Sequence, residues 1–236
     1  MKKSLLTLAF AAGSLAALAQ TTPAAAPASS TPAVAAAPTP AGYAEQLSTA
    51  ITQVMSTNDA ATLTSLCAKL ERLAAAVPTD WLPRYYQAYA LLMQARGGKD
   101  AQPDALLDRA EAALKQARQL NGDESELLAL QASIYQGRLT IDPMQRAQEY
   151  SPLVMETTAL AESLNPANPR PYLIEANQLY YTPEMYGGGT GKARPLYEAA
   201  KAKFAAFHPA GPLAPNWGES YLLTRLKSYG PATAAK

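Results

Sequence analysis

Few side chains in this sequence could carry out covalent or metal-dependent chemistry. The chain has one histidine, His208, and one cysteine, Cys67. Zinc sites need several such ligands, and nucleophilic catalysis needs a base held beside a serine or cysteine. His208 lies between Phe207 and Pro209, which indicates a helix end, and Cys67 lies among leucines, which indicates a buried, inert thiol. The sequence therefore predicts no metal site, no cofactor and no catalytic residue of these kinds.

Carboxylates are the remaining candidates for acid–base chemistry. Asp123, Glu124 and Glu126 lie close together, but acidic residues gather at a helix N-terminus because the helix dipole favours them there. Glu126 and Glu175 occur on neighbouring repeated segments and form a pair that could serve a hydrolase. This hydrolase hypothesis stays open beside the structural interpretation of the same residues.

A glycine-rich stretch between Tyr186 and Lys192 invites comparison with a phosphate-binding loop, since backbone amides at such turns bind anions. A phosphate loop needs glycine five residues before Gly191 and serine or threonine after Lys192, but Tyr186 and Ala193 occupy those positions. We therefore predict a structural turn. The alternative is a ligand-binding rim that uses Tyr181 and Tyr186.

The elements that position these residues repeat along the chain. Apolar and small residues recur with a spacing of four and then three, so each set forms one face of a helix. The period is about 42 to 44 residues, which predicts stacked helical hairpins. The first-helix sets are Tyr86/Ala90/Met93, Leu128/Ala132/Tyr135 and Tyr172/Ala176/Leu179, and the second-helix sets are Ala110/Leu114/Ala117, Val154/Thr158/Ala161 and Ala193/Tyr197/Ala200.

Capping residues divide these segments into helices and leave no strand. Asn58 is the expected N-cap of the second helix, and Pro195 could delay the start of the eighth helix to Arg194. The expected helices are 43–55, 58–77, 81–96, 104–120, 123–138, 150–164, 168–181, 190–207 and 217–229. They form units at about 43–78, 80–122, 123–166 and 168–208, followed by the C-terminal helix, and the fold class is all-α.

The offsets within each unit resemble the tetratricopeptide repeat (TPR). Tyr172, Ala176 and Leu179 match its first helix, and Ala193, Tyr197 and Ala200 match its second. The resemblance covers most of residues 80–207 and implies an α-α superhelix. The units are longer than the family's repeat of about 34 residues, and we place the extra length in the turn between the two helices of each unit.

The same resemblance implies a binding surface on the first helix of each unit. In the TPR family these positions line a concave groove, and here they are largely polar, which suits an extended peptide or a carboxylate. A solvated helix face would look the same. Together with the tyrosines of the turn, the candidate binding residues are Arg84, Gln87, Gln94, Glu126, Ser133, Gln136, Arg170, Asn177, Tyr180, Tyr181 and Tyr186.

The N-terminus indicates export. Residues 1–19 combine Lys2 and Lys3 with a short apolar run and an Ala-Leu-Ala end, which is typical of a cleaved signal peptide; an uncleaved anchor is the alternative. Residues 20–42 are rich in alanine, proline and threonine, which predicts a disordered linker before a helical domain at 43–230. Loss of Lys2 and Lys3 changes the formal net charge from +1 to −1, which argues against nucleic-acid binding.

These observations predict an exported, non-enzymatic TPR-like binding protein, most simply periplasmic, although secretion to the exterior would look the same. Its partner would be a protein or peptide segment or a small ligand, with no membrane span after signal cleavage. A periplasmic accessory component of a solute transporter is the alternative from another class.

The composition of residues 20–42 leads to a test on stability. A chain that begins at Gly42 should retain the melting temperature of the mature protein, because the removed residues lack the large apolar side chains needed to build a core. Thermal unfolding followed by circular dichroism checks this, and a large loss of melting temperature would show that the segment docks on the domain.

Overall fold

The computed structural model describes residues 39–97 and 102–229, and within them every regular element is a helix. The predicted signal peptide, and all but the last residues of the predicted linker, lie outside the described residues. Six helices form the first three hairpins: α1 (Tyr43–Ser56), α2 (Ala60–Ala76), α3 (Leu82–Arg96), α4 (Pro103–Gln119), α5 (Glu124–Ile141) and α6 (Pro143–Leu164). The all-α fold class is thus confirmed.

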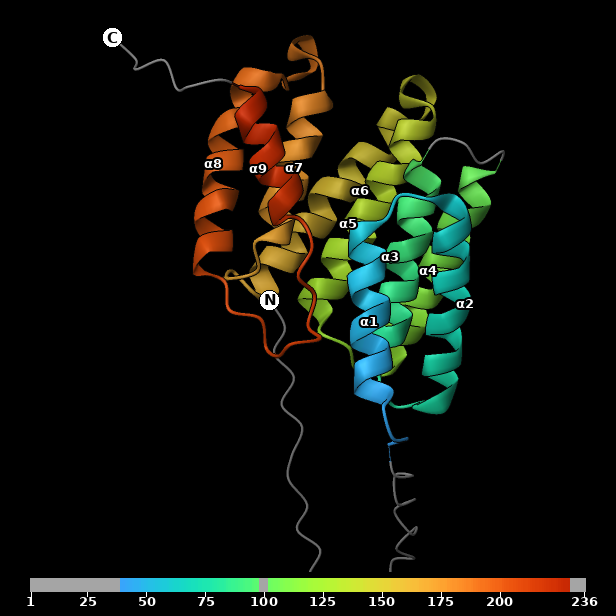
Figure 1. The fold of residues 1–236 in the computed structure, drawn as a ribbon. Coiled ribbons are helices and arrows are strands. Elements are labelled where there is room, and N and C mark those ends of the chain that lie inside the picture. Colours follow the sequence, from blue (N-terminus) through green and yellow to red (C-terminus); the bar gives the residue numbers. More distant parts are fainter. Residues whose placement is uncertain (1–38, 98–101, 230–236) are drawn as a thin grey trace, which may run out of the picture. The chain divides into compact units, whose positions relative to one another are not determined.

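The last part of the chain adds α7 (Arg170–Tyr181), the short 3-10 helix η1 (Glu184–Tyr186), α8 (Thr190–Ala206) and α9 (Glu219–Ser228). Each helix packs against its partner in the hairpin and against the following hairpin, and α3 contacts α5, which in turn contacts α7 (Figure 1). Equivalent first helices are therefore neighbours, as in a stacked array.

Small residues allow this close stacking. Ala90, Ala132 and Ala176, the central residues of the first-helix sets, are completely buried. The second-helix sets are buried to the same degree, with Thr158 retaining an exposed fraction of 1%. The repeated four-then-three spacing predicted from the sequence is therefore the packing face of the helices, and this prediction is confirmed.

The predicted starts of α2 and α6 are wrong, each for a local reason. Asp59, and not Asn58, caps α2, because its carboxylate accepts the amide of Thr62 at 2.8 Å. Helix α6 begins at Pro143 because Asp142 caps it and proline is favoured at the first helical position. Helix α8 begins at Thr190, as the expected range 190–207 predicted, and Pro195 lies inside it without delaying the start to Arg194.

The extra length of the second unit is helical, and our expectation that it forms a turn is wrong. Helix α5 continues to Ile141 and α6 starts two residues later, so the hairpin is lengthened at one end. Two cations fasten this extension to α4. Arg146 pairs with Asp104 at 2.7 Å, and Arg138 pairs with Asp108 at 2.6 Å.

The connection between α8 and α9 does not continue the array. Residues 207–218 leave the end of α8, cross toward α3 and α5 and return to start α9 (Figure 1). The predicted start of the last helix at 217 is therefore two residues early, because Trp217 belongs to this connector. We call the side of α3, α5 and α7 on which the connector lies the inner face.

Replacing Ala132 with leucine tests the packing. No space is available at this completely buried position, so overpacking should lower the free energy of unfolding by roughly 1 to 3 kcal/mol. Urea denaturation measures the change. Ala159→Leu on the exposed side of α6 is the control and should have little effect; equal midpoints for both variants would contradict the observed packing.

Candidate functional site

A buried ion pair joins α5 to α7 at one end of the inner face. The Arg170 Nη1 lies 2.7 Å from the Glu126 Oε1, and the two side chains are only 1% and 5% exposed. Asn168 accepts the backbone amide of Arg170 at 3.1 Å, which fixes the start of α7. Two predicted binding residues, Glu126 and Arg170, are therefore brought together, but in the interior.

The same arginine holds the connector. Its Nη2 donates a hydrogen bond to the Pro215 carbonyl, and its guanidinium lies 5.2 Å from the Phe207 ring centre and 5.4 Å from that of Trp217. Such contacts between a cation and an aromatic face are favourable, more so when water is excluded. Arg170 thus connects α5, α7 and both ends of the connector.

Helix α3 also contacts the connector. The Trp217 indole donates to the Tyr85 hydroxyl at 2.6 Å, and that hydroxyl lies 3.4 Å from the Glu126 carboxylate. The Tyr86 hydroxyl donates to the carbonyls of Leu213 and Ala214 at 3.1 and 3.0 Å. Both tyrosines are completely buried.

Burial controls the protonation of this cluster. It raises the pKa of Glu126 from 4.5 to about 7, and the positive charge of Arg170 offsets the effect only in part. The charges that act most strongly on Glu126 are those of Arg170 and Asp123, and Glu175 is not among them. The structure therefore uses Glu126 in an ion pair and gives no support to a Glu126–Glu175 hydrolase pair.

The opposite end of the inner face is rich in exposed tyrosines. Tyr181 lies eleven residues after Arg170 on the same side of α7, or about 16 Å along the helix. Its side chain is 65% exposed, and that of Tyr221 on α9 is 43% exposed. The Tyr180 ring is partly buried beside them, with its centre 4.9 Å from that of Tyr181.

Arg225 organises these tyrosines. Its Nη2 donates to the hydroxyls of Tyr181 and Tyr221 at 2.6 and 2.9 Å, and its guanidinium lies 4.2 Å from the Tyr180 ring centre. Burial raises the pKa of Tyr181, as does its contact with Tyr221, and the positive charge of Arg225 opposes this only in part. We call Tyr180, Tyr181, Tyr221 and Arg225 the aromatic–arginine surface.

Helix α3 contributes a second arginine near this surface. Arg96 donates to the Ser133 carbonyl of α5 at 3.0 Å and interacts electrostatically with Tyr181 and Tyr221. Arg96, Tyr221 and Arg225 are not among the binding residues predicted from the sequence. The four-residue spacing of Tyr221 and Arg225, which places both on one side of α9, was the signal that could have found the last two.

Other predicted binding residues serve contacts between helices. Gln136 donates to the Ile174 carbonyl at 2.8 Å, Asn177 accepts the Tyr197 hydroxyl at 2.6 Å, and Gln94 donates to Thr64 at 3.1 Å. Ser133 is buried, with an exposed fraction of 3%. Tyr186 is 73% exposed on η1.

Arg84 and Gln87 lie elsewhere. They contact each other at 2.9 Å and line a depression of about 170 Å³ with Glu71 of α2 and Arg109 of α4. The structure does not bring them into one cavity with Arg170, which is buried behind the connector. Whether they bind a partner stays a prediction.

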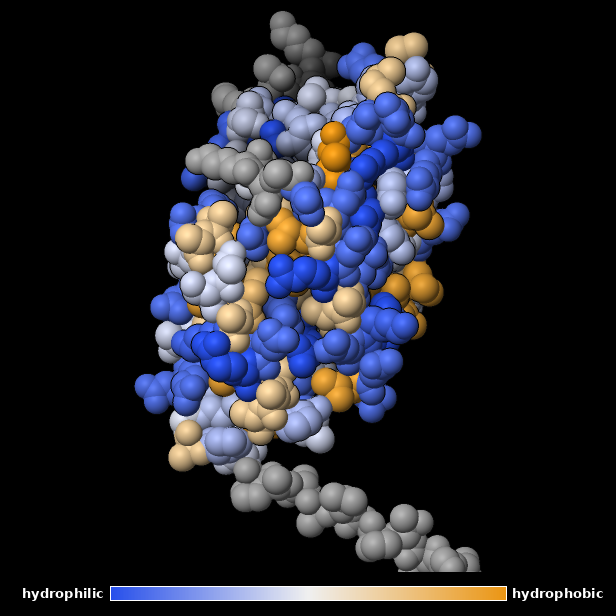
Figure 2. All heavy atoms as spheres, turned by 90° about the vertical axis from the view of Figure 1, so that its right-hand side faces the viewer, coloured by the Kyte–Doolittle hydropathy of each residue, from blue (hydrophilic) through white to orange (hydrophobic). Residues whose placement is uncertain are grey.

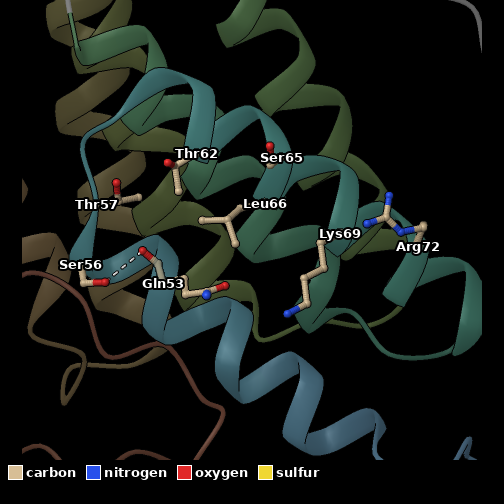
Figure 3. Close-up of a pocket in the computed structure, with 8 residues that line it drawn as sticks. All are labelled: Gln53, Ser56, Thr57, Thr62, Ser65, Leu66, Lys69 and Arg72. Carbon is tan, nitrogen blue, oxygen red and sulfur yellow. Dashed lines mark hydrogen bonds between the residues drawn. The ribbon is translucent and has the colours of Figure 1, made fainter.

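A larger depression of about 450 Å³ lies between the end of α1 and the exposed side of α2 (Figure 3). Its lining is mostly hydroxyl, amide and cationic: Gln53, Ser56, Thr57, Thr62, Ser65, Leu66, Lys69 and Arg72. The face in Figure 2 is largely hydrophilic with scattered apolar residues. Neither depression has the aromatic lining that is typical of a ligand site.

The glycine-rich stretch forms a turn, as predicted. The amide of Gly188 donates to the Pro183 carbonyl and that of Gly189 to the Leu179 carbonyl, so these amides are not available to a phosphate. A side chain at Gly188 would approach the Thr182 carbonyl oxygen to 2.2 Å, which explains why glycine stands there.

Other features bear on the type of protein. Within the described ranges, no three histidine, cysteine or acidic side chains are grouped as a metal site would require. Burial raises the pKa of Cys67 to about 11, which fits an inert thiol. None of the described helices has the length and apolar character needed to cross a membrane.

The fold and the site thus define an all-α protein of stacked hairpins with an aromatic–arginine surface. No protein-family model and no curated protein matches the chain. The solved structure of the HusA haemophore from Porphyromonas gingivalis does match, with 33% sequence identity and a TM-score of 0.73, over 84% of this chain and 98% of that one. The chain belongs to the family of this protein.

The pKa of Glu126 leads to a test of the buried pair. Between pH 4.5 and 7 the folded chain retains a proton on Glu126 that the unfolded chain releases. The contribution of this proton to the free energy of unfolding is therefore complete below pH 4.5 and is lost as the pH rises through 7. Glu126→Gln, which cannot titrate, should reduce this slope in urea-denaturation midpoints. The exposed Glu156→Gln is the control, and an unchanged slope in Glu126→Gln would contradict the raised pKa.

Proposed function

We propose that this chain is an exported carrier that binds haem, or a related flat tetrapyrrole, on the aromatic–arginine surface without transforming it. The observation that carries the proposal is the 33% identity over 98% of a protein described as a haemophore. The resemblance of the helical units to TPR hairpins is part of the same proposal, with the helices forming a rigid scaffold for the binding surface.

The chemistry of the surface matches that class of ligand. A tetrapyrrole has a wide, flat, largely apolar ring, and tyrosine rings offer flat contact area with a polar edge. Tyr181 and Tyr221 expose 65% and 43% of their surface on neighbouring helices. Haem also carries two carboxylates, for which arginine is a suitable partner.

Recognition would rest on the ring and its acid groups more than on the iron. Cys67 is buried with a raised pKa, and His208, the single histidine, is exposed after the end of α8. The hydroxyls of Tyr181 and Tyr221 accept hydrogen bonds from Arg225, so both oxygens already serve contacts within the surface.

A second candidate is a peptide or protein segment. The connector already lies on the inner face as an irregular segment, with the carbonyls of Leu213, Ala214 and Pro215 bonded to side chains of α3 and α7. This face therefore has side chains suited to binding a polypeptide backbone. The carrier function is preferred because the connector occupies those groups.

Titration with haemin and with metal-free protoporphyrin IX tests the carrier function. Both should give saturable changes in porphyrin absorbance and should quench tryptophan emission, because Trp217 lies on the inner face. The double variant Tyr181→Ala/Tyr221→Ala should weaken both affinities by tenfold or more, about 1.4 kcal/mol.

Leu223→Ala is the matched control, because Leu223 is exposed on α9 away from Tyr221. Its affinity should equal that of the unmodified protein. Failure of both porphyrins to bind the unmodified protein would refute the carrier function, and saturable binding that survives the double variant would place the ligand on another surface.

A further inference from the structure

Arg225 is held in place without an acidic partner. In the part of the chain that the structure describes, the ion pairs use Arg118, Arg138, Arg146 and Arg170. The hydrogen bonds of Arg225 go to two neutral hydroxyls, and its Nε is buried with no partner. A fixed cation beside exposed aromatic rings, with donors to spare, is complementary to an anion.

The geometry of the guanidinium leaves one side available. Its Nη2 donates to Tyr181 and Tyr221, while no hydrogen bond of Nη1 occurs among the described residues. Arginine presents its donors in a planar fork that matches the two oxygens of a carboxylate. Because the Tyr180 ring lies 4.2 Å from the guanidinium, the plane of this fork is held in one orientation.

A second arginine, Arg96, favours a ligand with more than one acid group. Arg96 of α3 interacts electrostatically with Tyr89, Tyr221 and Tyr181, and it likewise has no acidic partner in residues 39–97 and 102–229. It is anchored by one hydrogen bond to the Ser133 carbonyl, so its remaining donors are not committed. Two cations from different helices, neither ion-paired among the described residues, thus act on the same tyrosines.

We propose that Arg225, assisted by Arg96, forms a carboxylate-recognition subsite on the aromatic–arginine surface, so that the ligand is an aromatic polyacid oriented with its acid edge toward these arginines. This inference rests on the proposed function and adds the orientation and the acid requirement of the ligand. The tyrosine rings contact the flat part of the ligand, and the arginines discriminate the free acid from a neutral ester.

The test compares metal-free protoporphyrin IX with its dimethyl ester, which has the same ring without the negative charges. The unmodified protein should bind the diacid at least tenfold more tightly than the diester. Arg225→Gln should weaken diacid binding by roughly 10- to 100-fold, as expected for a lost hydrogen bond to a charged group, and should change diester binding by less than about twofold.

Three further variants complete the design. Arg225→Lys should lie between the unmodified protein and Arg225→Gln, because lysine retains the charge and loses the planar fork. Arg96→Gln should weaken the diacid selectively but less than Arg225→Gln. Lys227→Gln, which removes an exposed charge from the same helix, should change neither affinity.

The outcomes separate this inference from the proposed function. Equal affinity of the unmodified protein for diacid and diester would overturn the carboxylate subsite and leave the carrier function standing. Equal losses for both ligands in Arg225→Gln would show that Arg225 only holds α9 in place and would also overturn it. Failure of the unmodified protein to bind either porphyrin would refute the carrier function and the subsite together.

Discussion

The buried contact of Arg170 with Glu126 is the constraint on which the rest of the structure depends. A charge in the interior is tolerated only when it is paired and its hydrogen-bonding groups are used. Arg170 meets most of this requirement through Glu126 and the Pro215 carbonyl, although its Nε has no partner. The Pro215 carbonyl of the connector therefore takes the place of water beside a buried cation, and this contact explains why the connector crosses the inner face.

This arrangement divides the inner face into two chemically different ends. Near Arg170 the polar groups satisfy one another and the connector excludes solvent, so that end is structural. Near Tyr181, Arg225 donates hydrogen bonds to exposed phenol rings, and neither Arg96 nor Arg225 has an acidic partner among the described residues. The contacts near Arg170 also position α9, because the anchored Trp217 and the following Gly218 directly precede that helix. The aromatic–arginine surface therefore depends on the structural end of the inner face.

The sequence predicted the fold well because the helix contacts are periodic. Ala90, Ala132 and Ala176 recur at regular intervals, and small residues at such spacing leave few alternatives to closely packed hairpins. The site was harder to predict. Glu126 and Arg170 occupy groove positions of the TPR pattern, but the connector, which has no counterpart in the repeat, buries them. Arg225 was not predicted because it lies on α9, beyond the third repeated unit.

The anchoring of the connector also determines when the fold can be completed. Trp217 donates a hydrogen bond to Tyr85, which lies 132 residues earlier in the sequence, and Arg170 donates one to the Pro215 carbonyl, which lies 45 residues later. Contacts between residues so distant in sequence form late, because a long loop must close before they contribute. An emerging chain can therefore build its local hairpins one by one, whereas the charge on Arg170 stays incompletely solvated until almost the last helix has appeared. Such a chain cannot complete the packing around Arg170 while its C-terminal end is still missing, so a chain that stops before Pro215 buries this charge without one of its hydrogen-bond partners.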